Sequence, residues 1–342
     1  MNFIKKFNDT RNLLSVLTAR KTANGLKLLA SYYISKITSR NFHSGMPVSI
    51  AIEPTTACNL RCPECPSGLR SFTRNTGMLN IDFFKKIIDE IHKDLLYLTF
   101  YFQGEPFLNP DFLEMVKYAS EKGIYTATST NAHYLNDVNA KKTVESGLKR
   151  LIISIDGTTQ ETYETYRIGG ELDKVIEGTK NVLKWKKALN KKTPHVIFQF
   201  LIVKPNEHQM DDVKKLAVKL GVNQLKFKTA QIYDYKKGSE LIPEKGNHSR
   251  YVINGDGNYH LKNSLLNHCW KMWHSCVITW DGNVVPCCFD KDATHQLGNL
   301  NGNVFKSIWK SPSYQKFRKT ILGSRSEIDI CKNCTEGTKV WV

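Results

Sequence analysis

The sequence predicts an α/β fold, namely a partial (β/α)6 TIM-like barrel followed by a small cysteine-rich C-terminal domain. From residue 48 to about 229, short β-branched or aromatic runs alternate six times with amphipathic helical segments. Such alternation predicts a parallel sheet with right-handed crossovers. After about residue 230 the alternation stops and cysteines accumulate. The 342 residues, 41% of them hydrophobic, suffice for one large domain with an appendage.

The six expected strands are runs of residues that favour extended backbone, at 48–53, 97–102, 125–130, 150–155, 196–203 and 223–228. The helices between them carry stop signals, because Gly123, Gly147 and Gly221 stand just past helical patterns. Six βα units suit an open partial barrel with its chemistry at the C-terminal ends of the strands. We therefore expect the barrel over residues 47–229.

Residues 1–46 form a basic N-terminal extension, expected to be helical, with eight Lys or Arg residues and one acid, Asp9. Apolar residues recur there at helical spacing, at Leu26, Leu29, Tyr33 and Ile37. This pattern predicts the buried face of a helix that closes the bottom of the barrel. A helix lying on a membrane surface is the alternative.

Bulk properties predict a cytoplasmic protein, because the chain has no apolar run of ~20 residues and no signal-peptide pattern at its start. Nine cysteines in a reducing compartment indicate metal or redox chemistry rather than disulfides. The formal charge of +17 would suit an anionic substrate, a nucleic acid or an acidic membrane. Since the lysines are spread along the chain, without an Arg-rich tract or interleaved aromatic residues that would favour RNA, we interpret the charge as that of a generally basic soluble protein.

Three thiols follow the first expected strand within eight residues, at Cys58, Cys62 and Cys65. Soft thiolates select zinc or iron–sulfur clusters. Zinc sites usually draw four ligands from two separated pairs, and no His lies in this loop. Three thiolates can instead hold three irons of a [4Fe–4S] cluster and leave the fourth iron open.

This Cys-x3-Cys-x2-Cys loop, placed after the first barrel strand, resembles the signature of the radical SAM superfamily. In that family the open iron chelates the amino and carboxylate groups of S-adenosylmethionine (SAM). The resemblance implies reductive cleavage of SAM to a 5′-deoxyadenosyl radical, which abstracts hydrogen from a substrate. It also implies a one-electron donor such as flavodoxin or ferredoxin.

Four further strand ends resemble the SAM-binding positions of the family. The second resembles its Gly-Gly-Glu-Pro motif, although Gln103 replaces the first glycine. The third ends where the family contacts the ribose, the fourth resembles its Ser-x-Asp-Gly motif, and the fifth is interrupted by a polar residue. The implied SAM contacts are Gly104, Glu105, Pro106, Asn131, Ser154 and Gln199. Many relatives carry an aromatic residue before the third cysteine, where this chain has Glu64.

The C-terminal region, residues 230–342, resembles the SPASM and shorter Twitch auxiliary-cluster domains. Gly282 precedes the second cysteine of its first pair by the family spacing, and a Cys-x2-Cys pair closes the pattern. The implied ligands of one auxiliary [4Fe–4S] cluster are Cys269, Cys287, Cys331 and Cys334. Zinc on the same four cysteines is the alternative. Cys276 and Cys288 are expected to be packing residues.

Together these features predict a radical SAM enzyme of oxidoreductase type. Relatives with an auxiliary cluster use it to accept an electron from the substrate radical, so the resemblance favours oxidation of a peptide or small molecule. The sequence identifies no catalytic side chain. The alternative is a non-catalytic zinc- or cluster-binding protein that contacts nucleic acid through its basic surface.

Overall fold

The computed structural model describes residues 3–340, and the side chains from Asp9 onward. The outer ends of the expected segments 1–46 and 230–342, and the side chains of Lys5 and Lys6, lie outside the described residues. No helix within residues 3–340 is long and apolar enough to cross a membrane.

One sheet of nine strands organises the molecule, in the order β11-β10-β9-β1-β2-β3-β4-β5-β6. Strands β1 to β6 run parallel to one another and β9 pairs in parallel with β1, whereas the β9–β10 and β10–β11 pairs are antiparallel. A separate ribbon pairs β7 with β8. The strands are β1 Ser49–Ile52, β2 Tyr97–Thr99, β3 Tyr125–Thr130, β4 Arg150–Ser154, β5 His195–Ile202, β6 Gln224–Thr229, β7 Tyr251–Ile253, β8 Tyr259–Leu261, β9 Ser275–Ile278, β10 Asn283–Val285 and β11 Gly298–Asn299.

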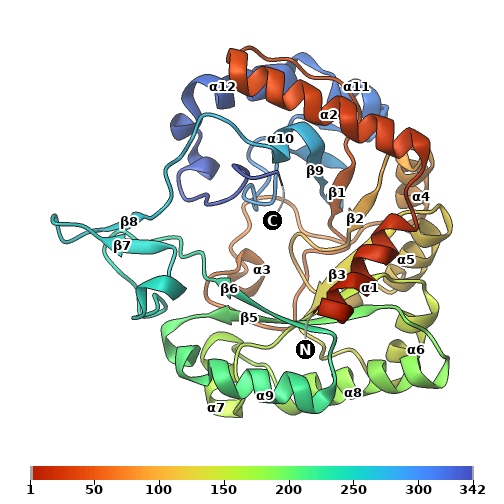
Figure 1. Cartoon of the computed structure of the whole chain (residues 1–342), viewed down its shortest axis with the longest axis vertical. Coiled ribbons are helices and arrows are strands. Elements are labelled where there is room, and N and C mark those ends of the chain that lie inside the picture. Colours follow the sequence, from red (N-terminus) through yellow and green to blue (C-terminus); the bar gives the residue numbers. More distant parts are fainter. Residues whose placement is uncertain (1–2, 341–342) are drawn as a thin grey trace.

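Helices α4 to α9 alternate with the first strands and lie along the outside of the curved sheet (Figure 1). The α-helices are α1 Phe3–Leu14, α2 Ala19–Thr38, α3 Pro66–Leu69, α4 Ile81–Ile91, α5 Phe112–Glu121, α6 Asp137–Glu145, α7 Gln160–Tyr166, α8 Leu172–Ala188, α9 Met210–Leu220, α10 Lys271–His274, α11 Phe305–Trp309 and α12 Pro312–Ser324. Short 3-10 turns are η1 Pro106–Leu108, η2 Lys204–Gln209, η3 Gly246–His248, η4 Arg325–Glu327 and η5 Asp329–Cys331.

The six expected strands correspond to β1 to β6, and the α/β partial barrel is confirmed. Most residues of β5 are buried, because helices cover the outer face of a parallel sheet. Gly123, Gly147 and Gly221 all have positive φ after helix ends, as their positions predicted. Since β11 and β6 are the two edges, the barrel is open.

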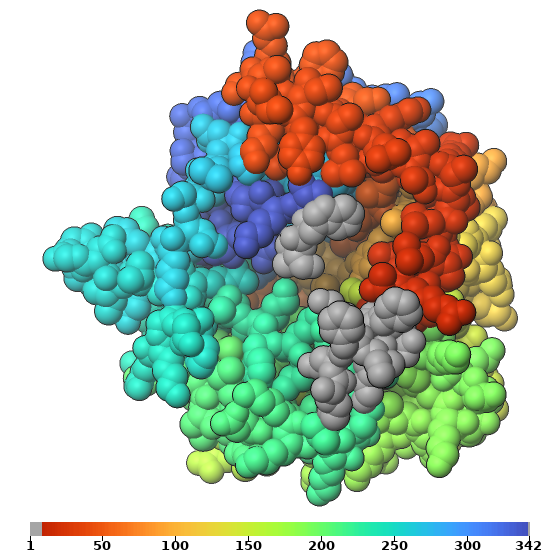
Figure 2. Space-filling model, in the orientation of Figure 1, coloured from red at the N-terminus to blue at the C-terminus, as the bar shows by residue number. Residues whose placement is uncertain are grey.

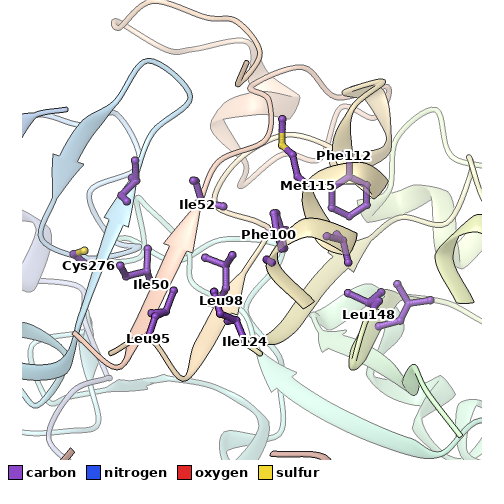
Figure 3. Packing of buried hydrophobic residues seen from close by; sticks show 14 of the residues in the cluster. Ile50, Ile52, Leu95, Leu98, Phe100, Phe112, Met115, Ile124, Leu148 and Cys276 are labelled. Carbon is purple, nitrogen blue, oxygen red and sulfur yellow. The ribbon is translucent and has the colours of Figure 1, made fainter. Parts of the chain in front are cut away.

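The cysteine-rich C-terminal region joins the barrel sheet, because β9 pairs in parallel with β1 from Ser49 opposite Ser275 to Ile52 opposite Ile278. Cys276 of β9 is buried beside Ile50 of β1 in the core, as Figure 3 shows. One hydrophobic core therefore includes residues on both sides of position 229. The domain boundary expected there remains a prediction from the sequence pattern.

The N-terminal helices contact residues at or just before the N-terminal ends of the strands, but α2 does so with a different face from the expected one. Asp9 of α1 accepts hydrogen bonds from Tyr125 and Arg150, the first residues of β3 and β4, at the bottom of the barrel. Helix α2 packs against α10 through Leu28 and Tyr32, which are fully buried. The expectation that Leu26, Tyr33 and Ile37 form the buried face is wrong, because these three side chains point outward.

Candidate functional site

The C-terminal ends of β1 to β4 border one cavity of about 270 Å³. A second hollow of about 400 Å³ shares Cys58 and Ser67 with it. Three of the strand ends contribute the polar residues expected from the sequence. The lining comprises Cys58, Leu60, Cys62, Cys65, Ser67, Gly68, Tyr101, Phe102, Gln103, Gly104, Glu105, Ser129, Thr130, Asn131, Ser154, Arg167 and Lys291.

The loop after β1 brings the thiols of Cys58, Cys62 and Cys65 to this cavity. The Cys65 N–H donates to the Cys62 carbonyl at 3.3 Å, and Cys65 is the N-cap of α3. Gly68 lies so close beneath the loop that a Cβ there would stand 2.5 Å from the Cys62 backbone nitrogen. The compact loop thus depends on a glycine three residues after the last cysteine.

The Cys58 and Cys62 thiols are buried enough to need a cation if they are to ionise. Burial raises the pKa of Cys58 to about 12, and it also raises the pKa of Cys62. Bound metal deprotonates a thiol outright, so iron would supply the missing stabilisation. The donor set therefore fits a [4Fe–4S] cluster held by three thiolates.

Gly104 brings the β2 end against the cluster loop. It has a φ of +74°, and a Cβ there would lie 2.2 Å from the Thr55 carbonyl oxygen. The Gly104 N–H donates to the Ser67 hydroxyl at 2.9 Å. Only glycine permits both the left-handed backbone and this close approach.

Glu105 is buried and joins the ends of β2 and β3. Its Oε1 accepts from the Thr130 hydroxyl at 2.7 Å, and its Oε2 accepts from the Asn131 N–H at 2.8 Å. Burial raises the pKa of Glu105 to about 7, while these hydrogen bonds favour the ionised form. Asn131 Nδ2 in turn donates to Asn59 Oδ1 at 2.8 Å, which ties β3 to the cluster loop.

Asp156, just past β4, binds the guanidinium of Arg167, which lies beside the first cysteine set. Asp156 is fully buried and accepts from Arg167 Nε at 2.5 Å and from the Leu201 N–H at 2.7 Å. Arg167 also directs an amino group at Cys62 Sγ, 3.7 Å away. Gly157 is required here because its Cβ would lie 2.4 Å from the Tyr163 nitrogen.

Among the expected SAM contacts, Gly104, Glu105, Asn131 and Ser154 line the cavity, and Pro106 and Gln199 are not among its lining residues. Pro106 is buried as the first residue of η1. Gln199 is the register partner of Ser154, so both side chains leave the same face of the sheet. Glu64, which replaces the family's aromatic residue, accepts from the Tyr233 N–H at 2.9 Å.

The second cysteine set converges around a buried arginine. Burial lowers the pKa of Arg325, but Cys269, Cys331 and Cys334 act to raise it. Burial raises the pKa of Cys287, and Cys269 and Cys334 raise it further. Arg325 Nη2 donates to Cys334 Sγ at 3.4 Å and to the Glu336 carbonyl at 2.9 Å. These four cysteines come from the α10, β10 and η5 regions.

The Arg325 Nε atom is buried without an acceptor in the described structure. A buried donor normally has a partner, and the sulfides of an iron–sulfur cluster accept hydrogen bonds. This orphaned donor beside the four cysteines fits an auxiliary cluster. Across residues 3–340, no three Cys, His, Asp or Glu side chains are close enough to hold a single metal ion.

The two remaining cysteines differ from each other. Cys276 is a packing residue in the core, as expected. Cys288 is exposed, so the expectation that it packs is wrong, and its Sγ accepts from Lys271 Nζ at 3.7 Å.

Sequence reasoning missed the cations of both sites, Arg167, Arg325 and Lys291. Each lies in a loop or a short turn, where no periodicity marks a residue as buried. Gly68 was also missed, although a glycine so near a cysteine loop is a signal of close backbone approach.

Two family models and several known proteins match the chain. The Radical SAM superfamily model matches residues 52–217, and the SPASM iron-sulfur cluster-binding domain matches residues 269–335. A tungsten-containing aldehyde ferredoxin oxidoreductase cofactor-modifying protein from Pyrococcus furiosus is 25% identical, over 78% of this chain and 82% of its own length. Mycofactocin maturase MftC from Mycobacterium tuberculosis is 27% identical, over 84% of this chain and 77% of its own length.

Among solved structures, Streptococcus suis SuiB bound to S-adenosylmethionine superimposes with a TM-score of 0.63 and 14% identity. The match covers 89% of this chain and 75% of SuiB. SuiB has also been solved bound to its precursor peptide SuiA, with a TM-score of 0.60. At this identity the likeness shows the fold alone.

Proposed function

This chain belongs to the radical SAM superfamily and carries a C-terminal SPASM domain, and we propose that its two cysteine sets hold two clusters with different tasks. The enzyme uses SAM-derived radical chemistry on a peptide or small-molecule substrate. Cys58, Cys62 and Cys65 would hold the SAM-binding [4Fe–4S] cluster. The auxiliary cluster would be held by Cys269, Cys287, Cys331 and Cys334.

The observation that carries this assignment is the shared cavity. Three thiols from one loop and polar groups from the ends of β2, β3 and β4 line the same 270 Å³ space. Three thiolates leave one iron free for an exchangeable ligand, and the amino acid moiety of SAM has the chemistry to fill that position. A buried structural zinc site has no need of such an adjoining polar cavity.

When bound, the clusters supply one-electron chemistry, namely reductive cleavage of SAM to methionine and a 5′-deoxyadenosyl radical at the first and electron acceptance at the second. The chain's own residues hold and orient the reactants. Glu105, Asn131 and Ser154 are positioned to bind the amino acid and ribose of SAM, because they border the cavity beside Cys58. Arg167 places positive charge near Cys62, which favours the ionised thiolate.

For the substrate we propose oxidation of a peptide or a small molecule at the mouth of this cavity. Lys291 lines the cavity, so a substrate bound there would contact this basic side chain. SuiB, which shares the fold, binds a precursor peptide, and this supports a peptide for the present enzyme. An acidic one-electron donor such as flavodoxin or ferredoxin suits the formal charge of +17.

The test is anaerobic reconstitution with iron and sulfide, reduction with dithionite and assay of 5′-deoxyadenosine formed from SAM. We expect the wild-type protein to form 5′-deoxyadenosine and Cys62→Ala to form none, because the open iron needs all three thiolates around it. Undiminished SAM cleavage by Cys62→Ala would show that Cys58, Cys62 and Cys65 do not hold the SAM-binding cluster.

The matched control is Cys288→Ala, which deletes an exposed thiol that belongs to neither set. It should keep both iron content and SAM cleavage. Equal loss in Cys288→Ala and Cys62→Ala would mean that Cys288 is a ligand and that the sets are misassigned.

A further inference from the structure

Helix α2 exposes a stripe of large apolar side chains to solvent. Leu26 is 61% exposed, Tyr33 46%, Ile34 45% and Ile37 81%. These positions recur at helical spacing, so they share one face of a helix of 20 residues, which is about 30 Å long. Figure 2 shows this orange-red segment along the upper edge of the molecule. Contiguous exposed apolar surface of this kind marks an interaction site.

The opposite face of α2 is largely polar and is already satisfied by the protein. Asn24 exchanges hydrogen bonds of 2.8 Å with the Met46 backbone, and the Ser35 hydroxyl donates to the Phe42 carbonyl at 2.7 Å. Lys21 Nζ donates to the Gly123 carbonyl at 2.6 Å. Helix α2 thus differs from an ordinary surface helix, because several polar residues pack inward beside Leu28 and Tyr32 while a second set of apolar residues faces water.

Basic residues flank the apolar stripe on both sides. At 100° per residue, Lys27 follows one border of the stripe and Lys36 the other, and both are exposed. Helix α2 contains no acidic residue, and the nearby Arg40 adds a further positive charge. Arg20, on the side of Lys27, pairs with Asp94.

We propose that α2 is a membrane-surface helix that binds anionic lipid bilayers, with Leu26, Tyr33, Ile34 and Ile37 inserted at the boundary between headgroups and acyl chains. Lysines on either side of such a stripe can lay their aliphatic stems along the acyl boundary while their ammonium groups reach the phosphates. Tyrosine is favoured at the same depth, since its ring is apolar and its hydroxyl is polar. This binding is independent of the cluster chemistry.

The charges beside the apolar stripe favour a bilayer over a second copy of the chain as the partner of α2. A symmetric contact between two α2 stripes would bring Lys27 and Lys36 of both copies together, with no acidic residue on either helix. Like charges across a contact oppose association, whereas an anionic lipid surface attracts both flanks at once. The same helix face therefore favours lipid over self-association.

The experiment is flotation of the full chain with vesicles of phosphatidylcholine alone and of phosphatidylcholine with phosphatidylglycerol. We expect binding only to the anionic vesicles, and weaker binding at higher salt because the lysine contribution is screened. The double variant Lys36→Glu with Ile37→Asp should weaken binding at least about tenfold, since it reverses one charge, adds a second negative charge and removes one inserted side chain.

The matched control is Lys219→Glu with Val218→Asp, an adjacent exposed pair in the last turn of α9. It makes the same change of charge and polarity away from α2, so its vesicle binding should equal that of the wild type. Equal weakening by both double variants, or no binding to anionic vesicles, would overturn the proposal. So would a wild-type dimer, seen by light scattering, that only the α2 variant dissociates while vesicles fail to bind.

Discussion

Glu105 joins two strand ends through hydrogen bonds and still has an acceptor position for a ligand. A carboxylate offers about four acceptor positions. Three are taken, by the Thr130 hydroxyl and the Phe107 N–H on Oε1 and by the Asn131 N–H on Oε2. Because Glu105 lines the cavity, we propose that the ammonium of SAM donates to the remaining position.

Replacing Glu105 tests this role. A charge-assisted hydrogen bond contributes about 1.5–3 kcal/mol, so Glu105→Ala should raise the SAM dissociation constant by about one to two orders of magnitude. Anaerobic calorimetry measures the constant, and iron analysis should show the clusters intact. Thr130→Val is the control, because it removes one brace of Glu105 but leaves the carboxylate in place, and its effect on SAM affinity should be smaller.

An unchanged dissociation constant in a folded, cluster-loaded Glu105→Ala protein would mean that Glu105 is only a brace. The same conclusion would follow if Thr130→Val and Glu105→Ala weakened SAM binding equally.

At the scale of elements, the cluster loop after β1 owes its shape to close backbone contacts. Gly68 in α3 packs directly on the Cys62 backbone, and the Arg61 N–H donates to the Ile168 carbonyl at 3.0 Å. The loop that carries the three thiols is therefore held in place by its contacts with Gly68 and with Ile168, in the segment after α7.

The change Gly68→Ala should disrupt this loop while leaving the barrel folded. A Cβ only 2.5 Å from the Cys62 nitrogen cannot be accommodated without moving backbone. We expect iron content to fall to about four per chain, and SAM cleavage to fall with it. The control is Gly323→Ala in α12, where a Cβ meets nothing within 4 Å, and which should retain full iron content and a normal circular dichroism spectrum. Full iron loading of Gly68→Ala would contradict this account of the loop.

Most of the first six strands could be predicted from the sequence because they are local runs rich in β-branched or aromatic residues, whereas β6 alternates polar and apolar residues. The exposure of the apolar side chains of α2 could not be predicted, since their spacing is that of the buried face of a helix. Only the tertiary partners of Asn24, Ser35 and Lys21 decide that its polar side faces inward. Strand β9 escaped notice because four residues beside many cysteines give little periodicity, and its pairing with β1 joins residues more than 220 positions apart.

At the scale of the whole molecule, the pairing of β9 with β1 brings the two cysteine sets into one body. The cluster loop follows β1, and Cys287 follows β10, which pairs with β9. Ile52 and its register partner Ile278 are both fully buried in one core. The C-terminal region and the barrel should therefore unfold together.

Truncating Ile278 tests this coupling. Large-to-small changes in a core destabilise by about 2–5 kcal/mol, so Ile278→Ala should lower the urea midpoint of the whole chain, followed by circular dichroism. The control Ile253→Ala, on the β7-β8 ribbon where Ile253 is 56% exposed, should change stability by less than about 0.5 kcal/mol. Two separate transitions, with only the second shifted by Ile278→Ala, would show that the C-terminal region folds on its own.

The central claim, that two cysteine sets hold two clusters of which only the first cleaves SAM, is tested most directly by iron content and 5′-deoxyadenosine yield measured on the same samples. The wild type should carry about eight irons per chain, and replacing Cys58, Cys62 and Cys65 together should leave about four irons, redox activity and no cleavage. Replacing Cys331 and Cys334 should do the reverse, keeping some cleavage in a chain that circular dichroism shows to be folded. Zinc in place of the second four irons, or cleavage that survives loss of the first three cysteines, would contradict the account.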